Sequence, residues 1–129
     1  MPISVMLKPA SSNCNLACEY CFYHSLSSKR TDFSKGFMSD DTAKRVVDSA
    51  LEFADSTDVY FTFQGGEPLL CSLDFYKNFV SYVKKSNKKG SNVHYCLQTN
   101  ATLINDEFAL FFKENGFLIG VSLDGDKEV

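Results

Sequence analysis

Long apolar runs and an excess of positive charge are both missing from the sequence. No apolar stretch approaches the ~18 residues needed to span a bilayer. The residues before the first Ser- and Cys-rich segment, Met1 to Leu7, are too few for a signal peptide. Thirteen basic residues against sixteen acidic ones give a formal net charge of −3, whereas a protein that binds nucleic-acid phosphates is normally basic. We therefore expect a soluble, cytoplasmic protein that binds neither membranes nor nucleic acid.

Internal repeats and low-complexity tracts are also absent, and a chain of 129 residues leaves room for one domain only. The sequence is not poor in core-forming residues, because 44% of it is hydrophobic and it contains 12 Phe and 6 Tyr. This composition excludes intrinsic disorder.

Strand and helix patterns alternate along the chain. Short apolar runs predict strands at residues 3–8, 59–63, 93–98 and 117–123. Apolar residues at helical spacing, preceded by capping residues, predict helices that begin near Ser39, Ser72 and Asn105. This order favours an α/β fold with a parallel sheet, which right-handed crossovers would curl into part of a barrel or an open sheet. The last run is almost continuously apolar, so we expect a strand covered on both faces. The chain stops just after this strand, and a barrel cut at that point has an unpaired, apolar strand edge. We therefore expect residues 1–129 to be the N-terminal part of something longer.

Three of the five cysteines, Cys14, Cys18 and Cys21, have the spacing C-x3-C-x2-C. In a chain without export signals such a group more often binds metal than forms disulfides. Three thiolates on one loop can hold three irons of a cubane cluster and leave the fourth iron open for a substrate. Structural zinc stays an alternative, although zinc usually takes four protein ligands and His24 is the only nearby candidate for the fourth. The isolated Cys71 and Cys96 are expected to be small buried hydrophobes.

Each predicted strand is followed by a polar motif. The cysteine segment follows the first strand, and the others are Gly65-Gly66-Glu67-Pro68, Gln98-Thr99-Asn100 and Ser122-Leu123-Asp124-Gly125. Parallel-barrel enzymes place their sites at the carboxyl ends of the strands, so the four motifs are expected around one mouth. Two adjacent glycines let the backbone approach a ligand closely, and a carboxylate beside them suits an ammonium group.

With these motifs the chain resembles the radical S-adenosylmethionine (radical SAM) enzymes. The resemblance implies the first four βα units of a partial (β/α)6 barrel. It also implies a [4Fe–4S] cluster on Cys14, Cys18 and Cys21. The amino and carboxylate groups of SAM chelate the open iron of this cluster, and an electron from the cluster cleaves SAM to give a 5′-deoxyadenosyl radical. The residues that it assigns to SAM are Tyr20 beside the adenine, Gly65, Gly66 and Glu67 at the methionyl amino group, and Ser122 at the ribose.

More narrowly, the chain is similar to the anaerobic sulfatase-maturating enzymes. The segments that carry this similarity are residues 8–12, 21–26, 63–68, 98–100 and 122–125, although Ala101 stands where those enzymes often carry Gly. The similarity implies that a Cys or Ser of a sulfatase is oxidised to Cα-formylglycine, with Tyr23 and Gln64 near the peptide. It also implies a low-potential electron donor of the flavodoxin or ferredoxin type.

Those enzymes also have a C-terminal cysteine-rich region, called SPASM, with two further clusters and the catalytic base. The present sequence contains none of it, so the base is not assigned and the activity of residues 1–129 alone is in doubt. Two alternatives stay open. One is another peptide-modifying radical SAM enzyme, and the other is a non-catalytic zinc-binding module.

Overall fold

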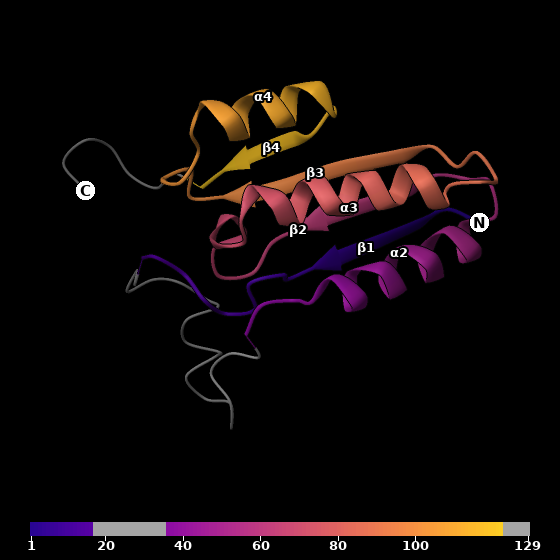
Figure 1. Cartoon of the computed structure of the whole chain (residues 1–129), viewed down its shortest axis with the longest axis horizontal. Helices are drawn as coiled ribbons and strands as arrows, with labels where there is room; N and C mark the ends of the chain where they lie inside the picture. Colours follow the sequence, from indigo (N-terminus) through magenta and orange to yellow (C-terminus); the bar gives the residue numbers. More distant parts are fainter. Residues whose placement is uncertain (17–35, 123–129) are drawn as a thin grey trace.

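The computed structural model describes residues 1–16 and 36–122. Their parallel strands form one sheet in the order β1-β2-β3-β4 (Figure 1). The strands are Ile3–Leu7 (β1), Val59–Phe63 (β2), Val93–Thr99 (β3) and Leu118–Val121 (β4). The helices between them are Asp40–Ala54 (α2), the short 3-10 helix Pro68–Leu70 (η1), Leu73–Ser86 (α3) and Asp106–Glu114 (α4). The predicted α/β fold with a parallel sheet is confirmed.

The helices begin where capping residues predict. The Ser39 hydroxyl accepts a hydrogen bond from the Thr42 amide (3.1 Å), and the Asn105 side chain accepts one from the Phe108 amide (2.9 Å). Such caps contribute about 1 kcal/mol each to helix stability. Ser72 is the N-cap residue of α3, but its side chain makes no capping hydrogen bond. None of the helices in the described ranges combines the length and apolar character that a membrane crossing needs.

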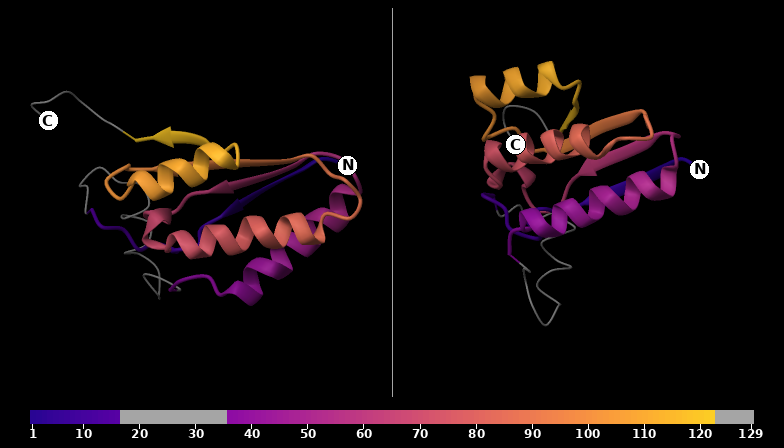
Figure 2. Two further views of the ribbon diagram at one scale, coloured as in Figure 1. Left: turned by 45° about the horizontal axis from the view of Figure 1, so that its top comes forward. Right: turned by 45° about the vertical axis from the view of Figure 1, so that its right-hand side comes forward.

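The helices lie on one face of the sheet (Figures 1 and 2), and the strands bury alternate residues beneath them. Phe61 and Phe63 of β2 are fully buried there and meet Phe79 of α3 edge to face, with ring centres 5.1 Å apart in both pairs. Tyr76 is also fully buried, and its hydroxyl donates to the Pro68 carbonyl (2.6 Å). This aromatic core therefore anchors the segment that follows β2.

Side chains on the other face of the sheet stay open. Met6, Thr62, Cys96 and Leu118 stand opposite one another in the strand register, and Met6 and Leu118 are 56% and 71% exposed. Cys71 is buried as expected, whereas Cys96 is only half-buried. The difference arises because Cys96 alternates with the buried Tyr95 and Leu97 and so lies on the open face.

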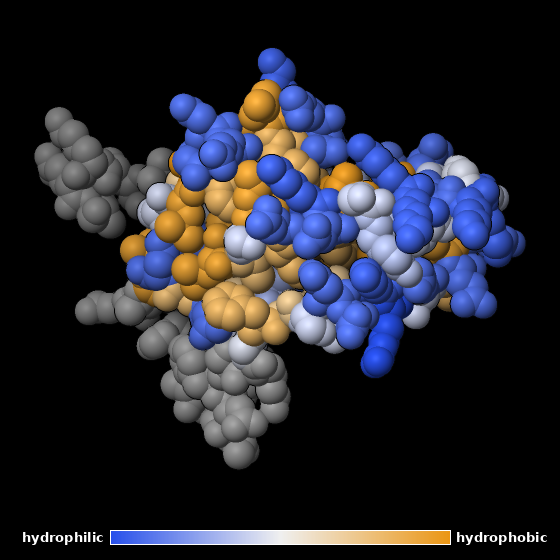
Figure 3. All heavy atoms as spheres, in the orientation of Figure 1, coloured by the Kyte–Doolittle hydropathy of each residue, from blue (hydrophilic) through white to orange (hydrophobic). Residues whose placement is uncertain are grey.

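The expectation that the last strand is covered on both faces is wrong for the residues described. Leu118 is 71% and Val121 is 53% exposed, and β4 pairs with β3 alone within the described sheet. β4 is the last strand in the order of the described sheet, so its side chains have strand neighbours on one side only. Figure 3 shows the helix-bearing side, where hydrophobic residues gather toward the carboxyl ends of the strands and hydrophilic residues toward their beginnings.

Candidate functional site

The cysteine segment begins at the carboxyl end of β1. Two tight turns shape it, with the Ser11 amide bonded to the Lys8 carbonyl (2.9 Å) and the Asn13 amide to the Ala10 carbonyl (3.0 Å). Cys14 follows as an exposed free cysteine, and its sulfur accepts a hydrogen bond from the Leu16 amide (3.4 Å). The other predicted residues of this segment lie outside the described residues, and they are Cys18, Tyr20, Cys21, Tyr23 and His24.

The Gly-Gly-Glu-Pro loop after β2 packs directly on the backbone of the cysteine segment. The Gly66 amide donates to the Ser11 carbonyl (3.0 Å), and the Glu67 amide donates to the Asn13 carbonyl (2.7 Å). A Cβ atom on Gly66 would lie 2.1 Å from the Asn13 oxygen, a distance at which atoms overlap. Gly65 has φ +120°, and a Cβ there would lie 2.7 Å from the Ser11 oxygen. Both glycines are therefore needed for the loop after β2 to pack against the cysteine segment. This requirement holds whether or not a ligand also binds there.

Gln64 precedes these glycines and continues the same contact. Its amide donates to the Leu7 carbonyl (2.9 Å), so the end of β2 stays bonded to the end of β1 just before the cysteine segment turns away. The predicted substrate residue Gln64 is thus on the same sheet edge as Cys14.

The Glu67 side chain is buried, with 1% exposure, and both oxygens of its carboxylate accept hydrogen bonds from the protein. One oxygen, Oε2, accepts from the Thr99 hydroxyl (2.7 Å) and the Leu69 amide (3.0 Å), and Oε1 accepts from the Asn100 amide (2.8 Å). These bonds join the loop after β2 to the end of β3. The carboxylate has a structural role here, and its contact with a methionyl amino group stays a prediction.

Asn100 connects the end of β3 to the cysteine segment. Its Oδ1 accepts from the Thr102 amide (3.0 Å) and hydroxyl (2.8 Å), and its Nδ2 donates to Asn15 Oδ1 (2.9 Å). The same Nδ2 lies 3.9 Å from the Cys14 sulfur, and Asn15 Nδ2 donates back to the Thr102 hydroxyl (2.7 Å). Sequence reasoning placed the motif containing Asn100 at the mouth but did not single out this residue. Asn100 directly follows the last residue of β3, and this position in the sequence could have indicated that its side chain lies at the site.

Ser122 lies beyond the end of β4 and beside β3. Its amide donates to the Thr99 carbonyl (2.9 Å), and its hydroxyl accepts from Gln98 Nε2 (2.7 Å). Gly120 leaves room for this Gln98 side chain, because a Cβ at Gly120 would lie 2.2 Å from Gln98 Oε1. Asp124, which follows, lies outside the described residues.

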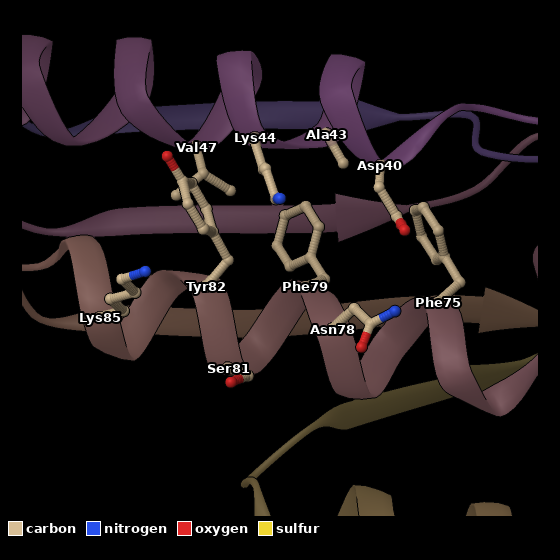
Figure 4. A pocket seen from close by; sticks show the side chains of 10 residues that line it. All are labelled: Asp40, Ala43, Lys44, Val47, Phe75, Asn78, Phe79, Ser81, Tyr82 and Lys85. Carbon is tan, nitrogen blue, oxygen red and sulfur yellow. The ribbon is translucent and has the colours of Figure 1, made fainter.

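The structure thus brings the described parts of the motifs together at the carboxyl edge of the sheet, where the strand arrows of Figure 1 end. The link is continuous, since Asn13 binds Glu67, Glu67 binds Thr99, and Thr99 binds Ser122. A pocket elsewhere, between α2 and α3 (Figure 4), contains none of the described site residues. Its walls come from the helices alone, with Lys44 Nζ 5.6 Å from the centre of the Tyr82 ring.

Comparisons with known proteins show the family to which the chain belongs. The family model of the Radical SAM superfamily matches residues 9–129. The cysteine-type anaerobic sulfatase-maturating enzyme of Clostridium novyi (strain NT) is 49% identical over 127 residues, which are 98% of this chain and 34% of that protein. The serine-type enzyme of Bacteroides thetaiotaomicron is 41% identical over 127 residues, or 98% of this chain and 30% of that protein. The chain spans about a third of the length of these relatives.

A solved structure gives the same result in three dimensions. Native anSMEcpe with bound AdoMet and Kp18Cys peptide superposes with a TM-score of 0.90 and 43% sequence identity, covering 100% of this chain and 34% of that one. The similarity in sequence is high enough for the shared fold to reflect common descent. The sheet described above therefore corresponds to part of that larger protein.

Proposed function

Because the chain belongs to the radical SAM superfamily, we propose that Cys14, Cys18 and Cys21 hold a [4Fe–4S] cluster at which SAM binds. Members of the superfamily use this cluster and SAM to generate a 5′-deoxyadenosyl radical that abstracts hydrogen from a substrate. Cys14 fits the role because it is exposed, free of disulfide and fixed at the carboxyl edge of the sheet. The superfamily match favours a cluster over structural zinc.

The residues around this position are proposed to bind and orient SAM. The Ser122 hydroxyl already accepts a hydrogen bond from Gln98, so its own proton is available to donate to an acceptor such as a ribose oxygen. We propose that Gly65 and Gly66 offer backbone groups to the methionyl amino group. Glu67 supports that loop through its buried carboxylate, and any direct contact with the amino group is an added role. Tyr20 is proposed beside the adenine.

For the parent protein we propose oxidation of a Cys or Ser in a sulfatase polypeptide to Cα-formylglycine. The support is the similarity to both cysteine-type and serine-type maturating enzymes and to a structure with a bound peptide. Tyr23 and Gln64 are proposed at the peptide, and a flavodoxin- or ferredoxin-type protein is proposed as the electron donor in the cytoplasm. We further propose that residues 1–129 are the N-terminal part of the radical SAM domain. The catalytic base would then come from the SPASM region of the longer protein.

The observation that carries this proposal is the direct seating of the Cys14 segment on the Gly-Gly-Glu-Pro loop. Two hydrogen bonds, from Gly66 to Ser11 and from Glu67 to Asn13, hold the first cysteine beside the residues proposed for SAM. The cluster cysteines and the residues that bind SAM must lie close together, because SAM chelates the open iron while the protein binds the rest of the SAM molecule.

Electron paramagnetic resonance tests the cluster and SAM together. The protein is reconstituted without oxygen using iron and sulfide, reduced, and measured with and without SAM. We expect a [4Fe–4S]+ signal that changes shape when SAM is added, and we expect Cys14→Ala to abolish it. Cys96→Ala is the matched control, since this cysteine is half-buried on the open face of the sheet. One equivalent of zinc without sulfide would instead support the zinc-binding module.

A peptide assay tests the substrate. The full-length protein is given a peptide with the sulfatase motif Cys/Ser-x-Pro/Ala-x-Arg, and the aldehyde of formylglycine is detected by hydrazide capture and mass spectrometry. Aldehyde formation that requires SAM supports sulfatase maturation. Inertness toward this peptide, together with turnover of a different peptide, would support another peptide-modifying radical SAM enzyme.

A further inference from the structure

We propose that the side-chain amide of Asn100 donates a hydrogen bond to the Cys14 sulfur and thereby raises the reduction potential of the cluster. Asn100 is then a positioning and tuning residue that need not touch substrate. The inference rests on the proposed function, because it requires a cluster bound at Cys14.

The orientation of the Asn100 amide is fixed by its neighbours. The Thr102 backbone amide can only donate, and it lies 3.0 Å from Asn100 Oδ1. The other terminal atom of the amide is therefore the nitrogen, which faces the cysteine segment. This nitrogen donates one of its two hydrogens to Asn15 Oδ1, with 2.9 Å between nitrogen and oxygen, and the Cys14 sulfur lies 3.9 Å from the same nitrogen. A second hydrogen is thus available for the sulfur.

The backbone beneath this side chain is also held. The Asn100 amide donates to the buried Glu67 carboxylate (2.8 Å), and the preceding Thr99 is 2% exposed and bonded to the same carboxylate. The cysteine segment is held by the backbone of the same residue, because the Glu67 amide donates to the Asn13 carbonyl (2.7 Å). The segments that carry the donor and the sulfur are therefore both bonded to one buried residue, Glu67, which limits their relative movement.

A donor at this distance from a ligand sulfur affects the electron affinity of a cluster. Reduction adds negative charge that spreads onto the sulfur ligands, and a hydrogen-bond donor stabilises that charge. Removing the donor should make the reduced state less stable and lower the potential. Replacing the donor nitrogen by a carboxylate oxygen should lower the reduction potential further, because the negative charge of the carboxylate repels the charge added to the cluster.

The test is an anaerobic redox titration of the reconstituted chain, followed by electron paramagnetic resonance and visible absorption. Asn100→Asp keeps the shape of the side chain and the acceptor for Thr102, but it replaces the donor by an oxygen. Asn15→Ala is the matched control, because it removes both bonds of Asn15 and leaves the contact between Asn100 and the sulfur. If the Asn100→Asp variant incorporates no cluster, the midpoint potential of Asn100→Ala is compared with those of the wild type and Asn15→Ala instead.

We expect the midpoint potential to shift to a more negative value in Asn100→Asp and to stay at the wild-type value in Asn15→Ala. Equal shifts in both variants would overturn the proposal, since Asn100 would then act only by bracing the loop through Asn15. An unchanged potential in Asn100→Asp would overturn it as well, while the cluster itself would still stand. A wild-type chain that takes up no iron and sulfide would overturn both this inference and the proposed function.

Discussion

The hydroxyl of Thr99 donates a 2.7 Å hydrogen bond to the carboxylate of Glu67, and both side chains are almost completely buried. Thr99 ends β3, whereas Glu67 lies in the loop after β2, so this single bond joins two strand ends. The carboxylate also receives the Leu69 and Asn100 amides. A buried acceptor that loses a donor costs more free energy than the bond contributed when it formed, because water cannot replace the lost partner.

Thr99→Val is therefore expected to destabilise the chain although it preserves shape and β-propensity. The free energy of unfolding should fall by about 1–3 kcal/mol, because the variant removes one donor to the buried carboxylate and the acceptor of the Ala101 amide (3.1 Å). Denaturant unfolding followed by circular dichroism measures it. Thr62→Val is the control, because Thr62 lies on the open face of β2 and should change stability by less than about 0.5 kcal/mol. Equal effects in both variants would contradict the role given to the Thr99–Glu67 bond.

Gly66→Ala is expected to displace the cysteine segment. The new methyl group would overlap the Asn13 carbonyl, an atom of the backbone that cannot rotate away. Iron and sulfide content after reconstitution should fall to a small fraction of the wild-type value. In Gly90→Ala, nothing lies within 4 Å of the new atom, so that variant has only the strain of a positive φ, about 1–2 kcal/mol. Its iron content should equal that of the wild type, and a loss there would point to general instability instead.

Ala101→Gly is expected to stabilise the chain. Ala101 has φ 64°, in the left-handed region that costs an L residue roughly 1–2 kcal/mol and costs glycine nothing. Glycine adds an entropic cost of about 0.4–1 kcal/mol through the unfolded chain, so the net gain is roughly 0–1.6 kcal/mol. The same denaturant titration measures the gain. A loss of stability would mean that contacts of the Ala101 methyl group outweigh the backbone strain.

Thiol alkylation should separate the cysteines by burial. Burial raises the pKa of Cys71 to about 11, so in the folded chain its thiolate is scarce at pH 8 and stays scarce through pH 9. The exposed Cys14 should be modified much faster, and peptide mass spectrometry follows both sites. Because the pKa of Cys71 is higher in the folded than in the unfolded chain, the thiol favours folding below the unfolded pKa. This contribution is lost as the pH rises toward 11. Rapid labelling of Cys71 at pH 8 under native conditions would contradict this assignment.

Local patterns in the sequence were sufficient for most of the fold. The capping residues Ser39 and Asn105 and the helical spacing of apolar residues gave the helices, and parallel pairing followed from their alternation with strands. The exposure of β4 could not be predicted from its apolar composition. A continuous apolar run is the same for a central strand and for an edge strand, and only the sheet order distinguishes them.

The site was predictable as a set of motifs but not as a set of contacts. Nothing local in the sequence says that the Glu67 carboxylate is used by Thr99 and Asn100, since those bonds join residues 32 and 33 positions apart. The glycines were interpreted as room for a ligand, and the structure adds that Gly66 makes room for Asn13. Functional motifs of this kind bind one another as well as their ligands, so a motif residue can be indispensable without touching the cofactor.

Ser122→Ala is expected to weaken SAM binding without affecting the cluster. Loss of one hydrogen bond of about 0.5–1.5 kcal/mol corresponds to a roughly 2- to 13-fold rise in the dissociation constant. Gln98→Ala should act in the same direction, because the Ser122 hydroxyl accepts its hydrogen bond from Gln98 and donates its own proton onward. Gly120→Ala should resemble Gln98→Ala, since the added methyl group occupies the space of the Gln98 amide oxygen. The change of the cluster signal during a SAM titration measures all three.

A double variant that combines Gln98→Ala with Ser122→Ala decides whether Gln98 acts through Ser122 or contacts SAM itself. If Gln98 only orients the hydroxyl, its removal should have no further effect once Ser122 is Ala, and the two single effects should not add. Additive effects would mean that Gln98 makes an independent contact with the ligand. Non-additivity combined with an unchanged cluster signal in the absence of SAM would show that the end of β4 contributes to binding through one oriented proton. That orientation depends on Gly120 as much as on Gln98, because only a residue without a side chain leaves room for the amide between the two strands.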